Sequence, residues 1–144
     1  MIESIAPETL IPHRKPMLLI DSILRLGQDE ILAEKTIEPD AFFLQGHYPD
    51  YPIVPGVITC ECLFQAGAAL LAYRLGGKAS DGRVPVIARI KNAKFREAIR
   101  PGDRVFLLVK LKEELGGIFF LKGEARVGDK LATSVEFACA LRQP

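Results

Sequence analysis

The residues best suited to chemistry are a histidine and a glutamate fourteen positions apart, His47 and Glu61. His47 is one of only two histidines and stands in a loop rich in aromatic residues, glycine and proline, residues 41–55. A neutral imidazole in such a rigid and mostly apolar setting can act as a general base. The alternative is a histidine that only caps the loop through hydrogen bonds to the backbone.

Glu61 falls in a segment that is otherwise nearly free of charged and polar residues, residues 57–72. An ionised carboxylate there would lose much of its hydration, so we expect Glu61 to stay protonated near neutral pH and to serve as a proton donor. Gln65 follows four residues later on the same face of a helix and can hydrogen-bond Glu61 and fix its rotamer. Alternatively, the two residues form a buried polar pair with a purely structural role.

Two backbone groups complete the candidate site. Gly56 and Val57 open the predicted helix, where the N–H groups have no partner within the helix and the helix dipole favours negative charge. An oxyanion that develops on a substrate carbonyl can be held there. A base, an acid and an oxyanion site around one apolar tunnel are the groups needed to remove a proton next to a thioester carbonyl and to expel a β-hydroxyl. That chemistry requires neither a metal nor an organic cofactor.

The cysteines and the second histidine do not predict a metal site. Cys60 and Cys62 flank Glu61, but residues two apart on a helix point about 200° apart and cannot bind one ion together. With Cys139 the chain has an odd number of cysteines and no secretion signal, so we expect reduced thiols. His13 is interpreted as a structural residue of its loop and is given no catalytic role.

The elements that must position these groups are one long helix and about six strands. We predict the helix from Pro55, whose fixed φ suits the first helical position, to about Leu75, before Gly76-Gly77. Segments with strand character are Met17–Leu26, Ile31–Ile37, Val84–Phe95, Arg104–Leu115, Ile118–Val127 and Lys130–Leu141. The order predicts an α+β architecture in which a curved antiparallel sheet wraps around the helix. Because the helix lacks a broad polar face, we expect a second subunit to cover part of it.

Composition limits the remaining possibilities. The chain has 144 residues, 49% of them apolar, and a net charge of +1, which predicts one domain over residues 1–144 and favours neither nucleic acid nor membrane as a partner. The longest low-charge segment, residues 57–72, is shorter than the roughly 20 residues of a membrane helix. Prolines interrupt every apolar run near the N-terminus, so we expect a cytoplasmic protein.

The motif His47-Tyr48-Pro49-Asp50-Tyr51-Pro52-Ile53-Val54-Pro55-Gly56-Val57, followed by Glu61 and Gln65, resembles the signature of bacterial 3-hydroxyacyl-[acyl-carrier-protein] dehydratases of the FabZ type. The resemblance covers nearly the whole chain, since residues 11–21 are similar to the opening motif of that family and residues 93–103 to its motif in the middle of the sheet. The family has the hotdog fold. The related dehydratase-isomerases carry aspartate where Glu61 stands, so the resemblance favours dehydration without isomerisation.

The resemblance implies a role for each site residue. His47 matches the histidine that removes the α-proton, Glu61 the acid that protonates the leaving hydroxyl, and Gly56 the backbone donor to the thioester carbonyl, while Gln65 matches the residue that orients the glutamate. The implied substrate is a 3-hydroxyacyl thioester on acyl carrier protein, and the implied product is the trans-2-enoyl thioester. The implied assembly is a homodimer with active sites at its interface, which can build trimers of dimers.

Two other functions remain open at this point. A hotdog acyl thioesterase would activate water with a carboxylate and hydrolyse the thioester, and the spacing of His47 and Glu61 argues against it. A catalytically silent subunit that only binds acyl carrier protein would keep the fold for assembly, and the presence of both residues argues against that reading as well.

Overall fold

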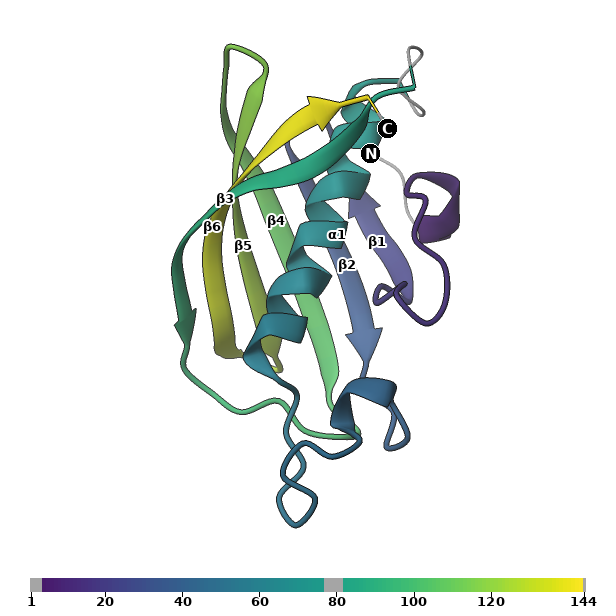
Figure 1. The fold of residues 1–144 in the computed structure, drawn as a ribbon, viewed down its shortest axis with the longest axis vertical. Helices are drawn as coiled ribbons and strands as arrows, with labels where there is room; N and C mark the ends of the chain where they lie inside the picture. The colour runs from purple at the N-terminus through teal and green to yellow at the C-terminus, as the bar shows by residue number, and fades with distance from the viewer. Residues whose placement is uncertain (1–3, 77–81, 144) are drawn as a thin grey trace.

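A six-stranded antiparallel sheet curves around one long helix in the computed structural model, which describes residues 4–76 and 82–143 (Figure 1). The strand order is β1-β2-β4-β5-β6-β3. In chain order the elements are β1 (Ser22–Leu26), β2 (Glu30–Thr36), α1 (Gly56–Arg74), β3 (Val84–Phe95), β4 (Arg104–Leu115), β5 (Ile118–Val127) and β6 (Lys130–Arg142), with short 3₁₀ turns at Pro7–Thr9 and Phe42–Leu44. The predicted α+β architecture is confirmed.

The helix α1 forms the centre of the core. It contacts every strand from β2 to β6, and Leu63, Leu70 and Leu71 are fully buried against them. By length and hydropathy alone α1 could cross a membrane, but two-thirds of its most apolar stretch is buried inside the protein, as expected of a core helix. The sheet also packs closely on it at Gly123 of β5, where an added Cβ would lie 3.2 Å from Leu63.

The predicted bounds of the helix are nearly correct. Pro55 is the residue before the first helical one rather than the first itself, and Leu75 ends the helix with its N–H bonded to the carbonyl of Leu71. Gly76 follows with a φ of +87°, a conformation that glycine adopts without strain. Gly77, the second residue of the predicted stop, lies outside the described residues.

The glycine turns between the last strands are confirmed as hairpins. Gly116 and Gly117 join β4 to β5 and have φ values of +57° and +79°. Positive φ at both positions matches the tight turn that connects twisted antiparallel strands. Gly128, with a φ of +62°, serves in the same way between β5 and β6.

The first strand is shorter than predicted, which is a correction. Residues 17–21 were expected to extend β1, but the strand begins only at Ser22. The reason is a competing partner, because the carbonyl of Met17 and the N–H of Leu19 bond to the side chain of Gln65 instead of to a neighbouring strand. Pairing with β2 starts when the N–H of Asp21 reaches the carbonyl of Glu34.

The strand β3 lies at one edge of the sheet, and only β6 pairs with it within the described chain. Most of its residues are exposed, including the apolar side chains of Val86, Ile87, Ile90 and Phe95, of which Ile90 is 54% exposed. A long edge strand with exposed apolar side chains is a surface that other strands can pair with. The opposite edge, at β1, is partly covered by an antiparallel bridge between Ile5 and Ile23.

We predict that Gly67→Ala lowers the free energy of unfolding by about 1 kcal/mol or more. An added Cβ would lie 2.8 Å from the ring of Phe137, which is buried and packed edge-on against Phe64. Such overpacking typically costs about 1–3 kcal/mol, and the roughly 1 kcal/mol that alanine gains over glycine in a helix offsets only part of the middle and upper range of that cost. Urea denaturation at a fixed protein concentration measures the change.

A second pair of variants separates the clash from other effects of the same substitution. Gly67→Ala in a Phe137→Leu background places the methyl group next to a smaller side chain, so its cost should fall or change sign. An equal loss in both backgrounds would contradict this account of the packing.

Candidate active site

His47 is held by a tight loop at the beginning of α1. The chain reverses direction at Gly46 and Tyr48, with φ values of +77° and +49°, and the N–H of Tyr51 bonds to the carbonyl of Tyr48. The loop thereby returns to His47, so that Nδ1 of its half-buried ring lies 2.9 Å from the backbone oxygen of Ile53. In Figure 1 this loop projects beyond the N-terminal end of α1, at the bottom of the view.

The contact with Ile53 fixes the tautomer of His47. A backbone carbonyl oxygen can only accept a hydrogen bond, so Nδ1 must carry the proton. In the neutral ring the other nitrogen, Nε2, then has a free lone pair. Tyr48 packs edge-on against the ring, with centroids 4.7 Å apart. The loop therefore holds His47 in a form that can accept a proton at Nε2.

Glu61 and Gln65 lie on one face of α1, and their predicted hydrogen bond is confirmed. Nε2 of Gln65 donates to Oε2 of Glu61 at 2.9 Å and to the carbonyl of Met17 at 2.7 Å. Oε1 of Gln65 accepts from the N–H of Leu19 at 2.9 Å. Rotating the amide by 180° would turn all three contacts repulsive, so the network leaves Gln65 one orientation.

Glu61 is less buried than its sequence setting implies. The side chain of Glu61 is 30% exposed in the single chain, whereas Gln65 is 1% exposed. The loop of residues 11–19 lies on the helix face that carries Glu61, through the contacts of Gln65 with Met17 and Leu19 and of Glu61 with His13. In the single chain the carboxylate therefore keeps more contact with water than the expected loss of hydration implies.

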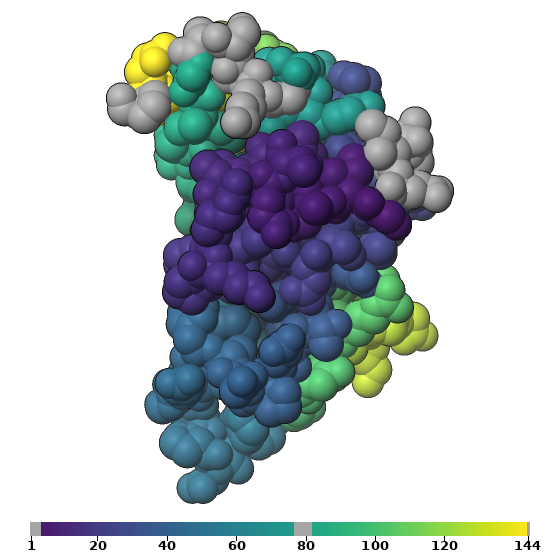
Figure 2. Space-filling view, turned by 90° about the vertical axis from the view of Figure 1, so that its right-hand side faces the viewer, coloured from purple at the N-terminus to yellow at the C-terminus, as the bar shows by residue number. Residues whose placement is uncertain are grey.

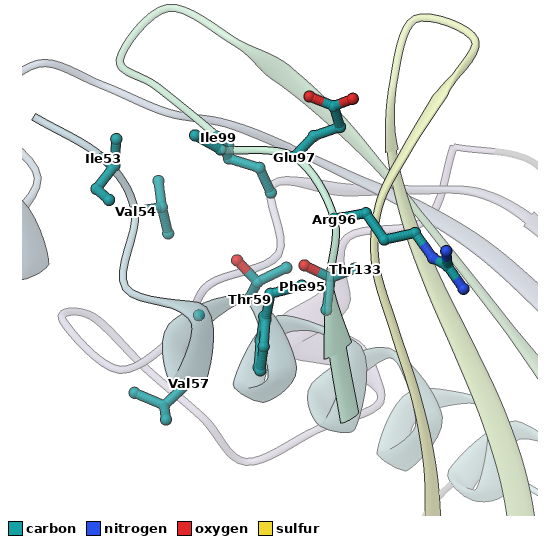
Figure 3. A pocket seen from close by; sticks show the side chains of 11 residues that line it. Ile53, Val54, Val57, Thr59, Phe95, Arg96, Glu97, Ile99 and Thr133 are labelled. Atoms are coloured by element: carbon teal, nitrogen blue, oxygen red, sulfur yellow. The ribbon is translucent and has the colours of Figure 1, made fainter. Parts of the chain in front are cut away.

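The start of α1 borders a cavity of about 420 Å³, which Figure 3 shows from close by. The N–H groups of Gly56 and Val57 donate no hydrogen bond within the described residues, and no side chain caps the helix there. The ring of Phe95 covers Gly56 so closely that an added Cβ would lie 2.6 Å from it. Glycine is thus required for this approach. The opening at the helix start can receive a carbonyl oxygen.

The structure brings some predicted residues together and separates others. Glu61 and Gln65 are in contact, and Gly56 and Val57 lie at the same cavity. Within the described chain, no hydrogen bond or ion pair links His47 to Glu61; the recorded contacts of the His47 side chain are with Ile53 and Tyr48. The two candidate catalytic residues are therefore held independently of one another.

His13 is the residue that sequence reasoning missed. Its Nε2 lies 4.0 Å from Oε2 of Glu61, although 48 positions separate the two residues along the chain. Nothing in the local pattern around His13 indicates this proximity, because it results from the loop of residues 11–19 folding back onto α1. A signal was present only indirectly, in that His13 lies within the motif at residues 11–21.

The three cysteines are buried and free. Burial raises the pKa of the Cys62 and Cys139 thiols to about 12 and also raises that of Cys60. Over residues 4–76 and 82–143, no three His, Cys, Asp or Glu side chains cluster in a way that could hold a metal ion. The cysteines beside Glu61 thus contribute packing to the core.

Comparison with known proteins agrees with the geometry. Residues 11–136 match the family model described as a FabA-like domain. The chain is 41% identical over 135 residues to a 3-hydroxyacyl-[acyl-carrier-protein] dehydratase FabZ of Paracidovorax citrulli, covering 92% of each protein. It is 34% identical over 141 residues to a FabZ of Xylella fastidiosa, covering 96% of this chain and 88% of that protein.

A solved structure shares the fold. The dehydratase heterocomplex ApeI:P from Xenorhabdus doucetiae superposes with a TM-score of 0.80 over 97% of this chain and 91% of that one, at 15% sequence identity. A curved antiparallel sheet around one long helix is the hotdog fold. The family model and the relatives identify the family: the chain belongs to the FabA-like family and, within it, to the FabZ-type dehydratases.

We predict that the three cysteines resist alkylation in the native protein. The thiolate is the reactive form, and a pKa near 12 leaves about one thiol in 10⁴ ionised at pH 8 for Cys62 and Cys139. In urea the pKa values return to about 8.5, and all three should react. Mass spectrometry after iodoacetamide treatment measures the labelling. Rapid labelling of Cys62 or Cys139 without denaturant would contradict the burial seen here.

Proposed function

We propose that this protein dehydrates 3-hydroxyacyl thioesters carried on acyl carrier protein, with His47 as base and Glu61 as acid. Nε2 of His47 takes a proton from the α-carbon, and the electron pair of that bond forms the double bond to the β-carbon. The bond from the β-carbon to its hydroxyl breaks, and that oxygen takes the proton of Glu61 and leaves as water. The product is a trans-2-enoyl thioester, and a proton passed from His47 back to Glu61 restores the enzyme.

The observation that carries this proposal is that each of the two side chains has one atom fixed by a hydrogen bond, so that its other atom is available for proton transfer. The carbonyl of Ile53 leaves His47 with its lone pair on Nε2, as a base requires. The amide of Gln65 donates to Oε2 of Glu61, which leaves Oε1 to carry and release a proton. One group is set to accept a proton and the other to donate one.

The helix start supplies the third requirement of the reaction. Negative charge develops on the thioester oxygen when the α-proton is removed, and donors aimed at that oxygen lower the barrier. The unpaired N–H groups of Gly56 and Val57 stand at the positive end of the α1 dipole and open onto the cavity of Figure 3. On this proposal Gly56 binds the carbonyl and Gln65 orients Glu61.

A second cavity, of about 630 Å³, offers room for the acyl chain. It runs from His13 along α1 past Ala68 and Ala72 to Leu75 and the start of β3. Ala68 and Ala72 follow Gln65 at helical spacing, on the same face as Glu61, and their small side chains keep this path open. An acyl chain lying there would place its first carbons beside the acid.

We also propose that two copies pair through β3. The free edge of that strand and its exposed apolar side chains provide both unpaired backbone groups and apolar area for a partner. Such a dimer explains how His47 and Glu61 meet: His47 of one subunit faces Glu61 of the other. Dimers can assemble further into trimers of dimers. A cytoplasmic location fits a substrate carried on acyl carrier protein.

We predict that His47→Ala and Glu61→Gln each reduce dehydration by about 10²–10⁴-fold while the protein stays folded. The first removes the base, and the second keeps the shape of the acid but carries no acidic proton. Glu61→Asp should keep partial activity, because only its reach is changed. The measurement is ultraviolet absorbance of the enoyl thioester formed from 3-hydroxyacyl substrates across a chain-length series.

The same assay tests the alternatives. Release of free acid and thiol would indicate a thioesterase, and binding of acyl carrier protein without turnover would indicate a silent subunit. Near wild-type dehydration by folded His47→Ala would remove His47 from the mechanism.

We predict that a refolded mixture of inactive His47→Ala and inactive Glu61→Gln recovers roughly 25% of wild-type activity. With random pairing, about half of the dimers are mixed, and two-fold symmetry gives each mixed dimer one doubly mutated site and one intact site. If both residues of a site came from one chain, every site would stay singly mutated. A mixture that exchanges subunits, as shown by mass spectrometry, but stays inactive would refute shared sites.

A further inference from the structure

His13 occupies an unusual position for a loop histidine. Its Nε2 is 4.0 Å from Oε2 of Glu61, and its Nδ1 is buried with no hydrogen-bond partner within the described residues. The rest of the ring is only partly covered, with 29% of the side chain exposed. The ring thus presents one nitrogen to the acid and one to the protein interior.

The buried nitrogen decides which tautomer His13 adopts. In the neutral ring only one nitrogen carries a proton, and Nε2 is the nitrogen that faces an acceptor, Oε2 of Glu61. A proton on Nδ1 would instead bury an N–H group without a partner, at a cost on the order of 1–3 kcal/mol. Nδ1 is therefore the bare nitrogen, and the proton lies on Nε2. This N–H points toward Oε2 of Glu61. The arrangement is the reverse of that in His47, whose Nδ1 carries the proton.

His13 and Gln65 approach the same oxygen of Glu61. Nε2 of Gln65 donates to Oε2 at 2.9 Å, and Nε2 of His13 faces Oε2 from the loop side. No contact to Oε1 is recorded for the described residues. An oxygen that accepts the N–H of Gln65 and faces that of His13 is disfavoured as the site of the acidic proton, because a proton there would meet both N–H groups.

We propose that His13 is a positioning residue for Glu61, which keeps Oε2 unprotonated and so directs the acidic proton to Oε1. The proposal rests on the proposed dehydration. When Oε1 gives its proton to the leaving hydroxyl, the charge that remains on the carboxylate is shared with Oε2, where both donors stabilise it. The separation of 4.0 Å exceeds that of a hydrogen bond, and such contacts often shorten when substrate closes a site.

The surrounding loop is built to keep His13 in place. Arg14 donates to the carbonyls of Ile11 and His13 at 2.9 and 2.7 Å, and its own carbonyl accepts from the N–H of Met17 at 2.9 Å. Farther along, Gln65 holds Met17 and Leu19. Figure 2 shows this N-terminal segment, in purple, spread across the middle of one face of the molecule. The loop is thus fixed on both sides of His13.

Two amide substitutions test the proposal because they differ only in reach. The side chain of His13→Gln is long enough to put its N–H near the position of imidazole Nε2, whereas that of His13→Asn ends near Nδ1 and cannot reach Glu61. We expect His13→Asn to lower kcat about tenfold or more with little change in KM, because a misplaced reacting group costs rate, not binding. His13→Gln should stay within about threefold of wild type.

Lys15→Leu serves as the control on the same loop, since Lys15 is exposed and should leave both constants unchanged. Thermal melting verifies that each variant is folded. Equal kcat values for His13→Asn and His13→Gln, whether both low or both normal, would overturn the positioning role and leave His13 as a structural residue.

Crystal structures of the wild type and both variants give a second readout that does not need activity. The Glu61 carboxylate should keep one orientation in the wild type and in His13→Gln, and take more than one in His13→Asn. The same orientation in all three would refute the proposal. If the wild type did not dehydrate any 3-hydroxyacyl thioester, the proposed function would fail, and this comparison would still decide whether His13 orients Glu61.

Discussion

The buried amide of Gln65 is the interaction on which the arrangement of the site depends. Gln65 is only 1% exposed in a mostly apolar helix, and its two amide hydrogens and its oxygen are all hydrogen-bonded, to Glu61, Met17 and Leu19. Losing it would leave the buried N–H of Leu19 without a partner, at a cost of about 1–3 kcal/mol, and would release the Met17 carbonyl and the Glu61 carboxylate. One side chain therefore sets the rotamer of the acid, anchors the loop that carries His13, and keeps Met17 and Leu19 out of β1, which begins only at Ser22.

The two candidate catalytic side chains are held in place by different kinds of contact. His47 is held by backbone geometry, since its loop returns within six residues to offer the carbonyl of Ile53. Glu61 is held by the side chain of Gln65 on the same helix, and it is faced at 4.0 Å by His13 of a loop more than forty residues earlier. Because no contact joins the two systems in the part of the chain that the structure describes, each can be fixed before substrate binds. In the proposed dimer, the meeting of His47 with Glu61 depends on assembly rather than on the fold of one chain.

The sequence predicted features that depend on residues close together in the chain, and it missed those that depend on residues far apart in the chain. The helix, the glycine hairpins and the bond between Glu61 and Gln65 depend on neighbours within a few residues, and all three were predicted correctly. The length of β1 was not, because the backbone of Met17 and Leu19 bonds to a side chain more than 45 residues away. The proximity of His13 to Glu61 and the partial exposure of Glu61 have the same origin. Local periodicity contains no information about which loop covers a helix face.

The strand β3 connects the candidate oxyanion site to assembly. Its last residue, Phe95, lies against Gly56, and only the absence of a side chain at Gly56 permits that contact. Phe95 is nevertheless 54% exposed, and the apolar residues Val86, Ile87 and Ile90 of the same strand are also exposed. A partner that pairs with the free edge of β3 would bury these side chains and hold the ring against the helix start. In the proposed dimer, the contact that completes the interface is therefore also the one that keeps the N–H groups of Gly56 and Val57 aimed into the cavity.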